Sequence, residues 1–80
     1  MKINQYKGMN NISGKYIRQA RKQHNLTQQQ LSEMLAERGL PLRRDCISRI
    51  EQGIRFVNDM ELSLIADCLK VPVSKLLGLK

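Results

Sequence analysis

Two adjacent arginines, Arg43 and Arg44, stand where the hydrophobic pattern places the start of a helix. The backbone N–H groups of a first helical turn carry partial positive charge, so a cation there costs about 0.3–1 kcal/mol. A helix start also favours a capping side chain that accepts a hydrogen bond, and arginine cannot accept one. Broken local rules in a small domain often mark a functional site. A phosphate group or the edge of a guanine base would turn this cost into an attraction.

The residues that follow complete a polar surface on the same predicted helix, which spans about residues 43–52. Its inward positions are Ile47 and Ile50. The outward face then carries Arg44, Asp45, Ser48 and Arg49. Arginine can bind O6 and N7 of guanine, and aspartate can accept from N4 of cytosine. We therefore predict that this face contacts bases in the major groove of DNA.

Two of these side chains have a second interpretation. Asp45 and Arg49 are four residues apart, which is the spacing of an ordinary ion pair within a helix. Asp45 could orient Arg49 instead of contacting a base, and both interpretations stay open. Arg44 has no local partner of this kind at the helix start, which favours contact with DNA.

The distribution of charge favours a polyanionic partner. The 80 residues carry a formal net charge of +7, and the first 32 contain six bases and no acid. Basic composition alone is weak evidence, because membrane-surface and ribosomal proteins share it. Lys15, Arg18 and Lys22 form one basic stripe at helical spacing. This stripe could bind phosphate through Lys22, or it could simply keep the protein soluble.

Length and residue types argue against several other functions. A single domain of this size buries about 60% of its unfolded surface, which leaves little room for a catalytic cleft. The sequence shows no paired carboxylates, no Ser/His/Asp set and no glycine-rich phosphate loop. We expect no enzyme activity and no cofactor. His24, Cys46 and Cys68 are isolated, so we expect neither a metal site nor a disulfide.

The sequence also argues against a membrane protein. Its apolar stretches are far shorter than the roughly 20 residues that span a bilayer. The N-terminal residues contain no apolar segment of the kind found in signal peptides. We therefore expect no membrane partner and a location in the cytoplasm.

Hydrophobic residues recur at helical spacing in five segments, which predicts an all-α, compact bundle of five short helices. Thr27 with Gln30 three residues later is a capping-box pattern, and Ser13 is expected to cap the first helix. The predicted helices cover about residues 13–24, 27–38, 43–52, 58–69 and 72–77. Residues 1–11 are polar and aperiodic, which predicts a flexible N-terminal arm before a domain at 12–80.

Three segments together resemble a known family. They are LTQQQL at 26–31, ISRIEQG at 47–53, and the apolar stripe that begins at Leu62 and continues through Ile65, Ala66 and Leu69 to Val71. This pattern resembles the lambda-repressor-like helix-turn-helix family of the Cro and repressor type, over about residues 12–78. The resemblance implies a transcriptional regulator, typically a repressor, that binds double-stranded DNA as a two-fold dimer.

The resemblance also implies roles for individual residues. Gln28 matches the family's phosphate-contacting glutamine, and Arg44, Asp45 and Arg49 match its base-reading positions. Arg55 is similar to a basic loop residue that touches the DNA backbone or minor groove. The full set of expected backbone contacts is Gln28, Gln29, Arg43, Arg55 and Lys22. Arg21 and Glu51 match a pair that commonly forms a structural salt bridge between the first and third helices.

The chain departs from the usual family pattern at two places. The segment from Leu35 to Ile47 is several residues longer than in the usual family pattern, with an apparent insertion at 39–42. The two leucines of this insertion, Leu40 and Leu42, are expected to pack into the core. A subgroup of bacterial regulators resembles this longer form. Arg43 stands where the family usually has a capping serine or threonine.

Three functions remain open on this basis. The leading hypothesis is a sequence-specific regulator, bound as a homodimer to an inverted-repeat operator, with Leu76, Leu77 and Leu79 as candidate dimer residues. A second is an antitoxin or a maintenance protein of a mobile element, which would also bind a protein partner. A third is a protein-interaction adaptor that keeps the fold without reading DNA.

Overall fold

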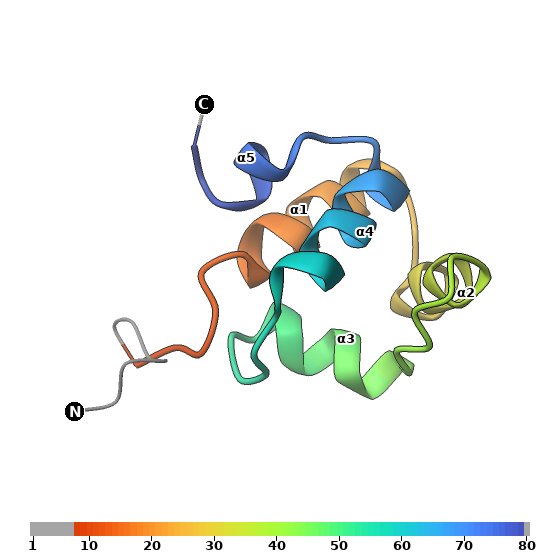
Figure 1. The fold of residues 1–80 in the computed structure, drawn as a ribbon, viewed down its shortest axis with the longest axis horizontal. Coiled ribbons are helices and arrows are strands. Elements are labelled where there is room, and N and C mark those ends of the chain that lie inside the picture. The colour runs from red at the N-terminus through yellow and green to blue at the C-terminus, as the bar shows by residue number, and fades with distance from the viewer. Residues whose placement is uncertain (1–7, 80) are drawn as a thin grey trace.

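The computed structural model of the chain describes residues 8–79. This range contains five helices and no strand, as Figure 1 shows, which confirms the predicted all-α bundle. The helices are α1 (Gly14–Gln23), α2 (Gln28–Glu37), α3 (Arg44–Glu51), α4 (Asp59–Leu69) and α5 (Val73–Leu76). The connection between α2 and α3 covers residues 38–43.

Two capping boxes set where α2 and α4 begin. The Thr27 hydroxyl accepts from the N–H of Gln30, whose side chain accepts from the N–H of Thr27. Asn58 and Glu61 repeat this exchange at the start of α4. Each box satisfies two backbone donors that a helix start leaves unpaired, so the sequence itself fixes both starting points.

The start of α1 differs from the prediction. Ser13 is the residue before the helix, but its side chain makes no capping hydrogen bond. The side chain of Asn11 accepts from the N–H of Gly14 instead, at 2.8 Å. Ser13 is only 2% exposed, because it lies where α1 packs against the rest of the domain. The expectation that Ser13 caps α1 is therefore wrong.

The apolar stripes of the helices meet in one core. α1 packs against α3, α4 and α5, while α2 packs against α3 and α4. The fully buried side chains include Ile17, Leu31, Leu35, Ile47, Ile50, Ile65, Leu69 and Leu76. Leu42 joins this core at 7% exposure and Leu40 packs against it, as expected for the long connection. α3 is thus held from behind by α1 and α2.

Leu76 was one of three candidates for the dimer surface, and the structure corrects this. Its side chain is fully buried between α5 and the rest of the core. Leu77 is partly buried against the same core, and Leu79 is 62% exposed. A side chain that fills the core cannot also contact a second subunit, so Leu76 is a packing residue.

The sequence assigned residues 10 and 11 to a flexible arm, and their hydrogen bonds show otherwise. The backbone N–H of Asn10 donates to the carbonyl of Gly53 at 2.8 Å, and the Asn10 side chain donates to the carbonyl of Ile54 at 2.7 Å. Asn11 donates to the carbonyl of Ile50 at 3.0 Å and to that of Arg55 at 2.7 Å. Residues 10 and 11 are therefore docked on the end of α3, while residues 1–7 lie outside the described range.

Gly14 lies where α1 passes closest to α3. A Cβ atom at this position would collide with the carbonyl oxygen of Ile50 and would lie 3.1 Å from that of Glu51. Both are backbone atoms of the end of α3, so they cannot swing aside as a flexible side chain could. The absence of a side chain at Gly14 therefore lets the first turn of α1 rest directly on α3.

We expect Gly14→Ala to destabilise the fold by about 1–3 kcal/mol, because the added methyl group overpacks a backbone contact. In an exposed helical position the same change would stabilise by up to about 1 kcal/mol. Urea unfolding followed by circular dichroism measures the difference. Gln19→Ala, at an exposed site in the middle of α1, is the control and should change little. A Gly14→Ala protein as stable as the wild type would show that α1 and α3 are not in this contact.

Candidate nucleic-acid interface

The outward face of α3 is polar and accessible. Ile47 and Ile50 are each 1% exposed and anchor the helix, so the opposite side must face solvent. Arg44, Asp45 and Arg49 are exposed and Ser48 is partly so. These four side chains line one groove together with Gln28, Gln52 and Ile54. The structure therefore brings the four predicted base-contacting residues onto a single surface.

No ion pair joins Asp45 to Arg49 in the described part of the chain. Asp45 lies in the first turn of α3, where a carboxylate is favoured by the partial positive charge of the helix start. Arg49 lies in the last turn, where a cation is favoured for the opposite reason. Each charge is thus stabilised by its own end of the helix, and both side chains are free to meet a ligand.

Arg43 precedes α3 without capping it, as its residue type predicted. Its backbone is extended and its side chain makes no capping hydrogen bond. Arg43 and Gln29 are both exposed and line a second groove with Ser32, Arg44 and Asp45. Two of the five predicted backbone-contacting residues therefore lie beside the start of α3.

A buried ion pair fixes the other end of α3. Arg21 Nε lies 2.7 Å from Glu51 Oε2, and Arg21 Nη2 donates to Glu51 Oε1 at 3.0 Å. The two side chains are only 9% and 3% exposed. Arg21 also donates to the carbonyl of Leu26 at 2.7 Å, so one guanidinium joins α1, the α1–α2 turn and α3. This is the pair of residues that the family resemblance connects.

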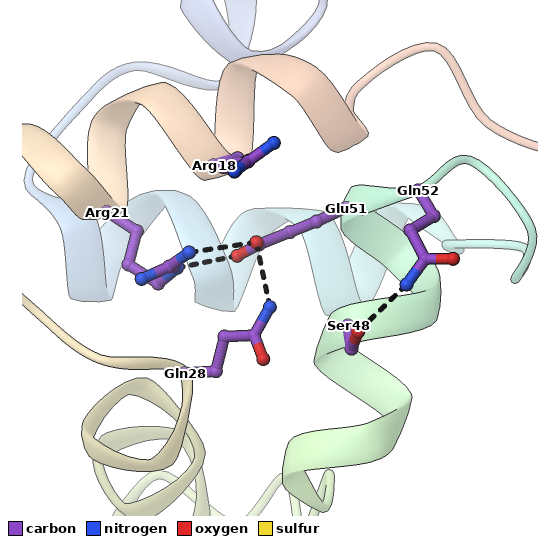
Figure 2. A pocket seen from close by; sticks show the side chains of 6 residues that line it. All are labelled: Arg18, Arg21, Gln28, Ser48, Glu51 and Gln52. Carbon is purple, nitrogen blue, oxygen red and sulfur yellow. Dashed lines mark hydrogen bonds and ion pairs between the residues drawn. The ribbon is translucent and has the colours of Figure 1, made fainter.

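Gln28 completes this network from the first position of α2. Its side-chain amide donates to Glu51 Oε1 at 3.1 Å, as Figure 2 shows. Glu51 therefore accepts from both Arg21 and Gln28, and the contact aims the Gln28 amide along the surface of α3. One N–H of this amide is engaged, and the second is the one left for the predicted phosphate contact.

Arg55 differs most from its predicted role. It forms an ion pair with Glu61, with 3.1 Å between Nη2 and Oε2, and it donates to the carbonyl of Phe56 at 2.8 Å. Hydrogen bonding from Arg55 holds the pKa of Glu61 below its ordinary value, so the carboxylate stays charged. The guanidinium thus connects the α3–α4 loop to α4. To contact DNA, Arg55 would have to bind a phosphate while it stays paired with Glu61, or else break that ion pair.

Lys22 lies apart from the α3 surface. It is exposed on α1 and lines a shallow groove with Lys15, Arg18, Gln19 and the edge of Glu51. The three basic residues predicted to share one face of α1 therefore do line one surface. Arg18 also lines the pocket between α1 and α3. Lys22 can reach a phosphate only if the DNA backbone passes over this side of the domain.

Two further residues lie near the site. Arg18, which the sequence analysis placed only in the basic stripe, and Gln52, which it missed, both line the pocket that holds the Arg21–Glu51 network (Figure 2). Gln52 donates to the Ser48 hydroxyl at 2.9 Å and so orients a predicted base-contacting side chain. The spacing of Ser48 and Gln52, four residues apart, was the signal that could have indicated this pair.

The described residues contain no group of three or more His, Cys, Asp or Glu side chains that could hold a metal ion. None of the helices in residues 8–79 is long and apolar enough to cross a membrane.

Burial raises the pKa of the Cys68 thiol, as expected for a cysteine that packs in the core.

Comparison with known proteins agrees with this geometry. A family model described as helix-turn-helix matches residues 17–76, which is three quarters of the chain and includes all of α2, α3, α4 and α5. The match contains the buried network and the outward face of α3. Neither a curated protein nor a solved structure matches the chain.

We expect Glu51→Gln to lower the free energy of unfolding by about 3 kcal/mol, because it leaves the Arg21 guanidinium buried without a carboxylate. The control is Arg38→Gln, which breaks a salt bridge to Asp67 whose side chains are 37% and 69% exposed. That loss should be much smaller, because water screens an exposed pair. Urea unfolding of both variants at one pH makes the comparison. Equal losses would mean that burial does not distinguish the two pairs.

Proposed function

We propose that this chain, which belongs to the lambda repressor/Cro-like helix-turn-helix family of DNA-binding regulators, acts as a sequence-specific transcriptional repressor. In this proposal α3 lies in the major groove, and Arg44, Asp45, Ser48 and Arg49 contact bases. Gln28, Gln29 and Arg43 bind the phosphates on either side. Lys22 and Arg55 are secondary contacts. Lys22 lines a different groove from the base-contacting residues of α3, and Arg55 is engaged by Glu61.

The observation that carries the proposal is that α3 is anchored on its buried face and at its last turn, while its start exposes two arginines. Its buried face is anchored by Ile47 and Ile50, and its last turn by the Glu51 network. Its first turn instead exposes Arg43 and Arg44 beside a helix start that disfavours them. A helix that is anchored on its buried face, and whose arginines have no partner within residues 8–79, is suited to a groove lined with phosphates and guanine edges.

The length of α3 supports binding as a homodimer. Eight residues extend only about 12 Å, so one helix reaches a few base pairs. Two copies related by a two-fold axis would read two half-sites about 34 Å apart, which defines an inverted repeat. Doubling the contacts in this way is how a single short helix can reach the affinity of a specific regulator.

Repression is the simplest regulatory outcome of such binding. A protein that occupies a promoter blocks polymerase through its DNA contacts alone, whereas activation also needs a surface that recruits polymerase. The surface described for α3 and the start of α2 is sufficient for the first of these outcomes. This reasoning supports a repressor in preference to an activator.

Selection of binding sites from random duplex DNA tests the proposal directly. We expect an enriched inverted repeat, bound at least about a thousandfold more tightly than random DNA, with an affinity that falls steeply with salt. Salt-sensitive binding without an enriched motif would contradict sequence-specific regulation. That result would favour the antitoxin or adaptor functions, which depend on a protein partner.

We expect Arg44→Ala to weaken binding to the selected site by about 1–3 kcal/mol and to relax the preference at one base pair. The reason is that Arg44 has no partner within the described residues and points from the first turn of α3. Fluorescence anisotropy on the selected site and on single-base variants measures both effects. Lys75→Ala removes the same charge from α5, on the far side of the domain in Figure 1, and is the control. Equal weakening of selected and random DNA by Arg44→Ala would exclude a role in base reading.

A further inference from the structure

The Ser48 side chain borders two hollows on the polar side of α3. It lines the groove that also contains Arg44, Asp45 and Arg49, and it lines the pocket around Glu51. Ser48 is partly exposed and lies one helical turn after Arg44. In the proposed function its hydroxyl faces the edge of a base. What the hydroxyl recognises there depends on which of its hydrogen-bonding groups the protein already uses.

A serine hydroxyl on its own discriminates poorly between bases. It has one hydrogen to donate and two lone pairs that accept, and the hydrogen rotates to suit its partner. Serine can therefore pair with acceptors such as N7 and O6 of guanine, or with a donor such as N4 of cytosine. A neighbouring side chain that fixes the direction of the hydroxyl hydrogen would remove this ambiguity.

Gln52 is such a neighbour. Its side-chain Nε2 donates to Ser48 Oγ at 2.9 Å, as Figure 2 shows. Its backbone N–H also donates to the carbonyl of Ser48, at 3.0 Å. The two residues are thus joined through both backbone and side chain across one turn of helix. Because the amide nitrogen of glutamine only donates, the Ser48 oxygen is the acceptor of the side-chain bond.

The hydrogen of the Ser48 hydroxyl has no acceptor within residues 8–79. Ser32 differs in this respect, because its hydroxyl donates to the carbonyl of Leu42 and its hydrogen is used inside the fold. A hydroxyl that accepts one hydrogen bond is a stronger donor in the next, since consecutive bonds polarise one another. The bond from Gln52 therefore leaves Ser48 with a strengthened donor that points away from Gln52.

We propose that Gln52 is a positioning residue that determines specificity: it makes Ser48 a hydrogen-bond donor, so that α3 selects an acceptor at the base that Ser48 faces. That base is a purine, which presents N7, or a thymine, which presents O4. Cytosine presents only the N4 donor in the major groove and is disfavoured there. The inference rests on the proposed function, because it requires α3 to lie in the major groove.

Two substitutions of Gln52 separate orientation of Ser48 from simple contact with DNA. Gln52→Glu places only acceptors beside Ser48, so the hydroxyl hydrogen turns toward the carboxylate and the oxygen is left to accept. We expect the preferred base to change to one that presents a donor, such as cytosine through N4 or adenine through N6. Gln52→Ala removes the partner altogether, and we expect it to relax the base preference by about three- to tenfold.

The test repeats the selection from random duplex DNA with the wild type and these variants. Ser48→Ala identifies the contacted base as the position whose preference relaxes. A 7-deazapurine in place of a purine there removes N7, and 5-methyl-2-pyrimidinone in place of thymine removes O4. We expect the analogue to weaken binding by the wild type, and to leave binding by Ser48→Ala unchanged.

Gln23→Glu is the matched control for the added charge. Gln23 is exposed at the end of α1 and lies outside the grooves described around α3. This variant should weaken binding to all sites alike and keep the base preference of the wild type. A change of preference in Gln52→Glu that is absent from Gln23→Glu is therefore caused by the position of the carboxylate and not by its charge alone.

Nuclear magnetic resonance without DNA tests the bond between the two side chains. We expect Ser48→Ala to shift the side-chain amide resonances of Gln52, because their acceptor is lost. Ser63→Ala, at an exposed position on α4, is the control and should leave them in place. Gln52 resonances that do not move in Ser48→Ala would overturn the positioning role, whatever DNA the protein selects.

The selections can also overturn the inference while the proposed function stands. One such result is an enriched motif whose base preference Gln52→Glu leaves unchanged. Another is an equal loss of affinity for every site in Gln52→Ala, which would mean that Gln52 contacts the DNA backbone instead of orienting Ser48. Cytosine as the wild-type choice at the Ser48 position would overturn it as well. Absence of any enriched motif with the wild type would overturn both the inference and the proposed function.

Discussion

The buried contact between Arg21 and Glu51 is the constraint on which the rest of the proposed DNA-binding surface depends. A desolvated charge is tolerated when it is paired and hydrogen-bonded. Each of the three guanidinium nitrogens of Arg21 donates one hydrogen bond, two to the oxygens of Glu51 and one to the carbonyl of Leu26, and Gln28 donates a further bond to Glu51. The ion pair therefore fixes the distance and rotation of α3 relative to α1, and it sets the direction of the first side chain of α2.

The two halves of α3 are held very unequally as a result. Its last turn is fixed by the Glu51 network, by Asn11 and by the close approach of Gly14 to the Ile50 carbonyl. Its first turn has no side-chain cap, because Arg43 stands there. Binding of a phosphate or base edge would supply the missing partner for exposed N–H groups as well as for the arginines. Stability and recognition are thus assigned to opposite ends of one short helix.

The sequence predicted features whose cause lies within a few residues of chain. The capping boxes at Thr27 and Asn58, and the apolar stripes that form the core, were all readable at helical spacing. Features that depend on distant residues were not. Asn11 donates to the carbonyl of Ile50, 39 residues away, and that contact left no local signal. Its bond from the N–H of Gly14 joins residues only three apart, so this cap was a local signal that the sequence analysis overlooked in favour of Ser13. The burial of Leu76 was missed because helix α5 is too short to show a periodic apolar face.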